Sequence, residues 1–69
     1  MDLKEIIEKI ENGLQIDFRN FDSRLHIYIS NSFVQHHFSL DYYMIKKKPE
    51  IILIEIEKAI EYINKGQHD

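Results

Sequence analysis

Two histidines and an aspartate are the strongest candidates for chemistry in this chain. Asp17, His26 and His37 alternate with apolar residues in three consecutive segments, so we expect all three on one face of a sheet. A tight turn at Asn31-Ser32 would place His26 opposite His37, and a hairpin closing around residues 20–23 would place Asp17 opposite His26, about 5 Å away. Two imidazoles and a carboxylate can hold Zn²⁺ with a water as the fourth ligand. We prefer an exposed polar row with a histidine–aspartate hydrogen bond, because the spacing matches no established metal motif.

A run of three lysines suggests a second kind of chemistry, the binding of phosphate groups. Lys46, Lys47 and Lys48 directly precede Pro49, where we expect a helix to begin. Ammonium groups beside the free N–H groups of a helix N-terminus are typical of phosphate binding. The run therefore predicts, as alternatives, nucleic-acid binding or, in an oligomer and together with the histidines, sequestration of a small nucleotide signal. A solvated basic run is the more common explanation, and the net charge of −3 argues against a general nucleic-acid binder.

Other catalytic motifs are missing from the sequence. The serines lack the glycine-flanked elbow of a nucleophile. The two glycines, Gly13 and Gly66, are both expected at helix ends, so there is no glycine-rich phosphate loop. The absence of cysteine excludes a disulfide framework and a thiolate metal site. Because 69 residues also leave little room for a closed cleft, we predict a non-enzymatic protein without a cofactor.

Two segments show the period of amphipathic helices. In residues 2–12, apolar side chains recur every three to four positions, Asp2 can cap the start, and Gly13 suits the left-handed conformation that ends a helix. In residues 49–65, a similar stripe follows the proline, and Gly66 is the expected end. This second stripe is wider than one sheet face needs, so the excess either covers Tyr42 and Tyr43 or forms a partner surface, such as a homodimer contact. The surplus residues are Ile51, Leu53 and Ile54.

Between the helices the period changes to two, which is typical of half-buried strands. We expect strands at residues 14–19, 24–30 and 33–40. The third strand is the least regular, and its best register turns the even-numbered residues inward. Residues 41–45 fit either an extension of this strand or one helical turn capped by Asp41.

The order helix, three strands, helix predicts an α+β fold of two layers. Short connections favour a three-stranded antiparallel meander, and the single apolar face of the strands places both helices on one side of it. We expect a single domain, residues 1–69. Because the sequence has no long apolar run and no visible signal peptide, we expect a protein of the cytoplasm that does not bind membranes.

The other face of the predicted sheet is open and carries aromatic residues among polar ones. Aromatic residues and arginine are enriched where proteins bind one another. A solvated sheet face is an equally common explanation of such a pattern. The residues that we expect to contact a protein partner are His26, Tyr28, Phe33 and Gln35 on the sheet, with Tyr42 and Tyr43 beside it.

The composition and element order resemble those of small accessory proteins of phages and prophages. Ile, Lys, Asn, Tyr and Phe, which use AT-rich codons, supply 32 of the 69 residues. The opening helix reads MDLKEIIEKIENG and is followed by three short strands and an isoleucine-rich helix. Some phage anti-CRISPR proteins, which inhibit a guide-RNA nuclease, are similar in size, acidity and element order. The resemblance implies an inhibitor that occupies the surface of a host defence or regulatory protein in the bacterial cytoplasm.

The element order also resembles that of a double-stranded-RNA-binding domain. In that family a lysine cluster begins the second helix, and Lys46 to Lys48 carry the resemblance here. Residues 20–23 read NFDS where the family has a Gly-Pro-x-His loop, and the second helix is rich in isoleucine instead of alanine. The resemblance implies RNA binding through the lysines, without the contacts that the family's loop provides.

Overall fold

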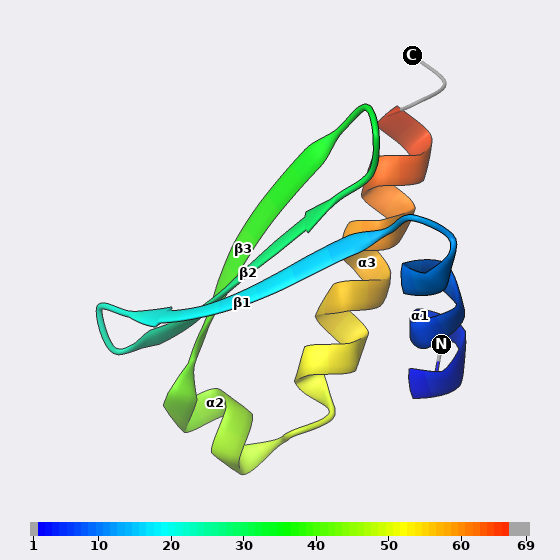
Figure 1. Ribbon diagram of the computed structural model, residues 1–69. Coiled ribbons are helices and arrows are strands. Elements are labelled where there is room, and N and C mark those ends of the chain that lie inside the picture. The colour runs from blue at the N-terminus through cyan, green and yellow to red at the C-terminus, as the bar shows by residue number, and fades with distance from the viewer. Residues whose placement is uncertain (1, 67–69) are drawn as a thin grey trace.

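The computed structural model describes residues 2–66, which form three helices and three strands (Figure 1). The strands make one antiparallel sheet in the order β1-β2-β3. The predicted α+β meander is therefore confirmed, with an additional short helix, α2, between the sheet and the last helix. The elements are α1 (Leu3–Glu11), β1 (Gln15–Phe21), β2 (Arg24–Ser30), β3 (Gln35–Asp41), α2 (Tyr42–Lys47) and α3 (Ile51–Gly66).

Helix α1 begins and ends with the caps that its sequence predicts. Asp2 is extended, and its Oδ1 accepts a hydrogen bond of 2.9 Å from the Glu5 N–H. After the C-cap Asn12, Gly13 adopts a φ of +112°, which a residue with a Cβ rarely tolerates. The helix therefore spans residues 3–11, one residue shorter at each end than the predicted helix of residues 2–12.

A two-residue turn joins β1 to β2 and sets their register. Asp22 and Ser23 have φ angles of 56° and 58°, as a type I′ turn requires, and Phe21 pairs with Arg24 across it. β1 therefore continues to Phe21, two residues beyond its predicted end. The predicted pairing of Asp17 with His26 is wrong, because the shorter turn moves the register by two residues and places Asp17 opposite Tyr28.

The connection between β2 and β3 is longer than predicted, for a local reason. The Asn31 side-chain oxygen accepts hydrogen bonds of 2.7 Å from the N–H groups of both Phe33 and Val34. Residues 31–34 therefore form a loop, β3 begins at Gln35 instead of residue 33, and His26 lies opposite Ser39 instead of His37. Because this shift is also two residues, the side chains that remain in β2 and β3 keep their predicted faces.

The segment after the sheet is helical and capped by Asp41. Its Oδ1 accepts a hydrogen bond of 2.7 Å from the Tyr43 N–H, so the second of the two alternatives for residues 41–45 is correct. Pro49 lies in the turn before α3, which begins at Ile51 and not at the proline. Within residues 2–66, no helix combines the length and the apolar character needed to cross a bilayer.

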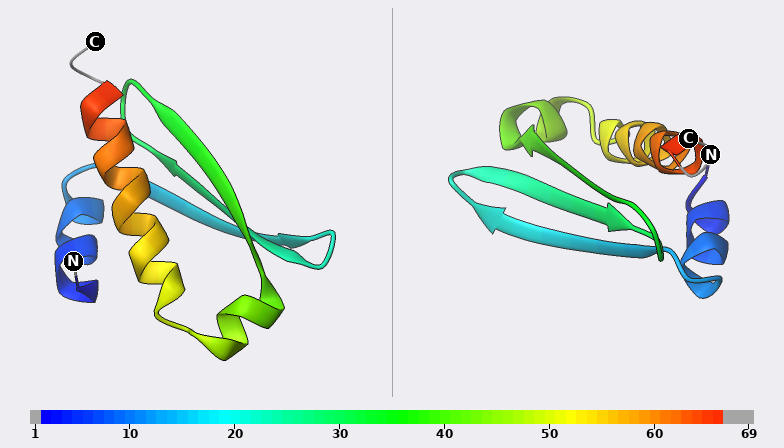
Figure 2. Two further views of the ribbon diagram at one scale, coloured as in Figure 1. Left: turned by 180° about the vertical axis from the view of Figure 1, so that it is seen from behind. Right: turned by 90° about the horizontal axis from the view of Figure 1, so that it is seen from above.

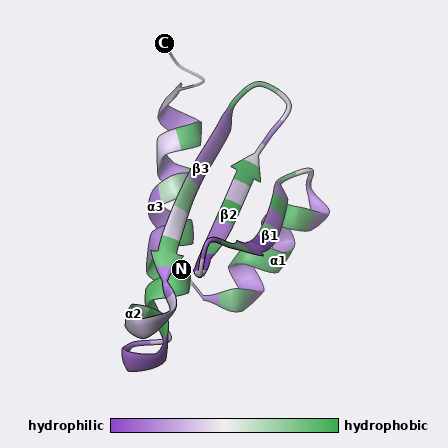
Figure 3. Cartoon of the chain, turned by 90° about the vertical axis from the view of Figure 1, so that its left-hand side faces the viewer, coloured by the Kyte–Doolittle hydropathy of each residue, from purple (hydrophilic) through white to green (hydrophobic). Residues whose placement is uncertain are grey.

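The core lies between one face of the sheet and the helices α1 and α3 (Figure 2). Ile27 and Ile29 of the central strand have no exposed surface, and Ile6 of α1 is 3% exposed. Figure 3 shows hydrophobic positions alternating with more hydrophilic ones along β2. The core positions on α3 are Ile56, Ala59, Ile60 and Ile63. The helices thus cover one face of the sheet, and the other face remains open.

We predict that the core depends most strongly on β2. Ile27→Ala should lower the free energy of unfolding by about 2–5 kcal/mol, because it removes buried methyl groups and leaves a cavity. Ile7→Ala on α1, where the native side chain is 48% exposed, is the matched control and should cost less than half as much. Urea denaturation followed by circular dichroism measures both values. Equal losses would contradict this placement of the core.

Candidate binding surface

The open face of the sheet presents polar and aromatic side chains from all three strands. Strand alternation places them opposite Ile27 and Ile29, on the side that the helices leave uncovered (Figure 2). The residues of this open face are Gln15, Asp17, Arg19 and Phe21 from β1, Arg24, His26, Tyr28 and Ser30 from β2, and Gln35, His37 and Ser39 from β3.

Four rings form a continuous ladder across this face. The Phe21 and His26 rings stack with centroids 3.8 Å apart and planes at 6°, and the Tyr28 and His37 rings stack at 4.5 Å and 22°. The Arg19 guanidinium carbon lies 5.5 Å from the centroid of the Tyr28 ring, within reach of a cation–π interaction. Because Phe21 covers it, His26 is only 8% exposed although it lies on the open face.

The two halves of the ladder are joined by a hydrogen bond between two histidines. His26 Nδ1 and His37 Nε2 are 3.0 Å apart, the ring centroids are 5.2 Å apart and the planes differ by 3°. The distance between the ring centroids exceeds the distance between the two nitrogens by about the width of one imidazole ring. This is the difference expected when both nitrogens lie close to the line between the ring centres. The rings are therefore coplanar and share a nearly linear N–H···N bond.

The direction of this bond follows from the other nitrogen of His26. His26 Nε2 is buried and has no hydrogen-bond partner among the described residues. A buried N–H without a partner is rarer than a buried acceptor without one, which favours the tautomer with its proton on Nδ1. His26 then donates to His37, and a neutral His37 carries its own proton on its other nitrogen, Nδ1.

This geometry does not form the predicted metal row of Asp17, His26 and His37. A zinc ion needs ligand lone pairs that converge on one point, about 2.0–2.1 Å from each nitrogen. Here the lone pair of one histidine points at the N–H of the other. Asp17 is engaged elsewhere, since its Oδ2 accepts a hydrogen bond of 2.9 Å from Arg19 Nε. Within residues 2–66, no three histidine or acidic side chains are grouped to hold a metal ion.

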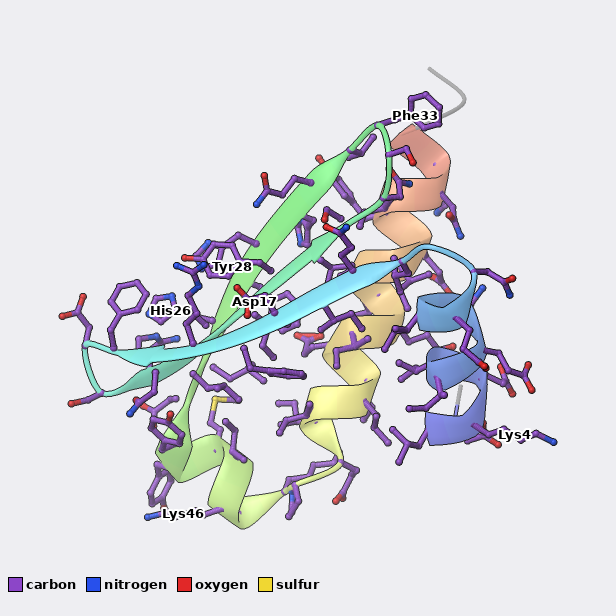
Figure 4. The ribbon with its side chains drawn as sticks, in the orientation of Figure 1. Lys4, Asp17, His26, Tyr28, Phe33 and Lys46 are labelled. Carbon is purple, nitrogen blue, oxygen red and sulfur yellow. The ribbon has the colours of Figure 1, made fainter. Side chains whose placement is uncertain are left out.

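Beside Tyr28 the open face is hollowed. The hollow has a volume of about 400 Å³, and its walls combine a cation, an anion, two amides and the Tyr28 ring. Asp17 and Arg19 bond to each other but keep 58% and 64% of their side-chain surface exposed, so a partner can still contact both (Figure 4 shows Asp17). The residues that line the hollow are Gln15, Ile16, Asp17, Arg19, Tyr28, Ser30 and Gln35.

The predicted partner-binding residues are only partly brought together. Tyr28 and Gln35 lie on the open face, whereas His26 is held beneath Phe21 and supports the surface from within. Phe33 is 83% exposed in the loop that follows β2, beyond the ladder (Figure 4). Tyr42 was expected beside the open face but lies against the opposite face of the sheet. Its hydroxyl donates a hydrogen bond of 2.8 Å to Asn20 Oδ1, and Asn20 alternates with the open-face residues of β1, so its side chain points to the opposite face.

The lysine run and Tyr43 form a separate exposed group at α2. Lys46 and Lys47 lie in the last turn of the helix, and Lys47 Nζ lies 5.8 Å from the Tyr43 ring, which is 70% exposed. Two of the N–H groups expected to be free at the start of α3 are already bonded. The N–H of Ile51 donates to the Lys48 carbonyl over 3.0 Å, and the next N–H along the chain donates to the Pro49 carbonyl.

Phe21 and Arg24 contribute to the open face, a role that the sequence pattern did not predict for either residue. Phe21 was assigned to the turn, and Arg24 to the outward face of the second strand without a role, yet Phe21 stacks on His26, and Arg24 Nε donates a hydrogen bond of 3.0 Å to Ser39 Oγ. The signal that could have found them is Asp22-Ser23, since aspartate tolerates a positive φ better than most residues. A two-residue turn there places Phe21 and His26 on the same face.

Comparisons with known proteins add no relative to this picture. No protein-family model, no curated protein and no solved structure matches the chain.

The histidine hydrogen bond predicts an asymmetric response to mutation. His37→Ala removes the described partner of His26 and should lower the free energy of unfolding by about 1–3 kcal/mol, because a buried polar ring is left unsatisfied. The double variant His26→Phe with His37→Phe replaces both partners by apolar rings and should be close to neutral. Urea denaturation compares the two variants with the native protein. If the double variant loses as much stability as His37→Ala, the hydrogen bond does not have this role.

Proposed function

We propose that this protein is a non-enzymatic binding protein that recognises a partner protein through the open face of its sheet. The observation that carries the proposal is the fixed position of Tyr28, between the His37 ring at 4.5 Å and the Arg19 guanidinium at 5.5 Å. Tyrosine and arginine are among the residues that most often dominate protein binding. Because contacts within the sheet already hold these side chains, they lose less conformational freedom when a partner binds.

The charges beside Tyr28 favour a protein over a nucleic acid as the partner of this face. The Asp17 carboxylate lies 2.9 Å from Arg19 and is more than half exposed, so a phosphate backbone near Arg19 would also meet a negative charge. The side-chain amides of Gln15 and Gln35 line the same hollow and can both donate and accept hydrogen bonds. Such a mixture matches a protein surface that carries charges of both signs.

The partner that we propose is a host defence or regulatory protein of a bacterium, inhibited because its surface is occupied. This part of the proposal is supported by the acidic composition of the chain and by its many residues that use AT-rich codons. It is also supported by the resemblance of the chain to small phage proteins of the anti-CRISPR type. A CRISPR nuclease is the most specific form of the hypothesis. The bacterial cytoplasm is the compartment in which such an inhibitor would act.

Two tyrosines provide a matched test of the binding surface. Native protein fixed to beads should capture a specific protein from bacterial lysate, identified by mass spectrometry. Tyr28→Ala should weaken capture about 30-fold or more, as expected when a binding residue worth at least about 2 kcal/mol is removed. Tyr43→Ala, at a tyrosine on α2 that is 70% exposed, should leave capture unchanged. Loss of capture with Tyr43→Ala alone, or no specific partner at all, would contradict the proposal.

A second candidate function, nucleic-acid binding, is favoured by the exposed Tyr43 beside Lys47. An aromatic ring next to ammonium groups can stack on a base while the lysines contact phosphates. The Ile51 N–H at the start of α3 donates to the Lys48 carbonyl and is therefore not free for such a site. Sequestration of a nucleotide has weaker support, because the two histidines that it needs bond to each other on the open face.

The lysine group predicts a salt-dependent interaction if this second function holds. Single-stranded and double-stranded RNA and DNA should then bind at low salt, and replacement of Lys46, Lys47 and Lys48 by glutamine should weaken binding at least about tenfold and flatten its salt dependence. Fluorescence anisotropy measures both effects, and Tyr28→Ala serves as the control that leaves this site intact. No anisotropy change with any nucleic acid at low salt would exclude the function.

A further inference from the structure

The outer edge of β1 has no strand partner within the described sheet. The strand order is β1-β2-β3, so β1 is an edge strand, and it runs for seven residues without a break in its pairing to β2. Natural edge strands are usually protected by charged side chains, above all lysine, or by proline, a bulge or a covering element. β1 has no proline, lysine or bulge, its two charged residues, Asp17 and Arg19, are of opposite sign, and Phe18 and Phe21 along it are 52% and 47% exposed. Figures 1 and 2 show α1 beside the start of β1 and the rest of the strand extending away from it.

The turn at Asp22-Ser23 determines which backbone groups of β1 point outward. In a two-residue hairpin the pair that flanks the turn, Phe21 and Arg24, exchanges hydrogen bonds, and such pairs alternate along the strands. The N–H and C=O groups of residues 15, 17, 19 and 21 therefore face β2. Those of Ile16, Phe18 and Asn20 face the free edge.

The sequence of β1 is complementary to itself in the antiparallel direction. If a second copy of β1 pairs about a twofold axis at Phe18, all seven residues overlap, and each Asp17 lies opposite the partner strand's Arg19. Opposite charges directly across a strand pair are stabilising. The same register places each Ile16 opposite an Asn20, so the outward backbone groups meet one another and can form about six hydrogen bonds.

The other edge of the sheet does not have these properties. Pairing of β3 with itself about Phe38 would place His37 opposite Ser39, with no pair of opposite charges. By the same alternation the Ser39 carbonyl faces that edge, where it already accepts a hydrogen bond of 3.4 Å from Arg24 Nη2. Helix α2 also begins directly after Asp41, at the end of the strand. The complementary edge is therefore that of β1.

We infer that β1 is an interface with a second copy of this chain, paired antiparallel about Phe18. The two three-stranded sheets then form one continuous sheet, in which the half-exposed Phe18 rings cover each other on the helix side. The twofold axis is perpendicular to the sheet, so both open faces lie on the same side. The dimer thus presents two Tyr28 surfaces in one plane, which goes beyond the proposed function and does not depend on it.

Proline substitution separates the two edges in a direct test. Sedimentation equilibrium of the native protein should show a concentration-dependent rise from 8.4 kDa to twice that mass. Phe18→Pro removes an outward N–H but no bond to β2, so it should leave a folded monomer. Gln35→Pro removes an outward N–H from β3 and should leave the dimer intact. A native protein of 8.4 kDa up to millimolar concentration, or a dimer that survives Phe18→Pro, overturns the inference.

Charge reversal tests the register without proline. Asp17→Arg places Arg opposite Arg19, and Arg19→Asp places Asp opposite Asp17, so each variant alone should dimerise at least about tenfold more weakly. Mixed together, the two variants should form a heterodimer, because every facing pair then has opposite charges. The double variant Asp17→Arg with Arg19→Asp should dimerise like the native chain. Native mass spectrometry distinguishes these species, and the absence of a preferred heterodimer overturns the inference.

Discussion

The turn at Asp22-Ser23 is the constraint on which the rest of the open face depends. Two consecutive positive φ angles close the hairpin with two residues, and this closure aligns Asp17 with Tyr28 and Arg19 with His26. The alignment brings Phe21 onto the His26 ring and Arg19 over Tyr28. It also decides which backbone groups of β1 bond to β2 and which face outward. One local backbone conformation therefore determines both the ring ladder and the character of the free edge.

The central strand β2 connects the core to the surface proposed for binding. Ile27 and Ile29 on one side are fully buried against the helices, while His26 and Tyr28 on the other side belong to the ring ladder. Because alternate residues share one backbone, packing of the isoleucines limits the movement of the rings. A small protein with a single helix-covered face can in this way hold a rigid recognition surface on the other face without enclosing a cleft.

Much of the fold could be predicted from local patterns. The caps at Asp2 and Gly13 act through a short-range hydrogen bond and backbone freedom, so their residue types and positions were sufficient, whereas the cap at Asp41 was one of two alternatives until the structure decided it. The inward and outward faces of the strands were also correct, because alternation survives any shift by an even number of residues. The register itself was wrong by two residues in both hairpins. Its cause lies in the Asn31 side chain and in the left-handed conformation at Asp22-Ser23, which the residue types permit but do not impose.

The sequence by itself determined the class of the fold, the faces of its elements and the absence of thiol chemistry. These properties follow from periodicity, capping and composition, which act over a few residues. Only the tertiary structure decided that His26 and His37 bond to each other instead of joining Asp17, that Tyr42 lies on the reverse side, and that Phe21 stacks on His26. The physical reason is that such contacts join residues distant in the chain, and their geometry depends on register and loop length, which are settled when the strands pack.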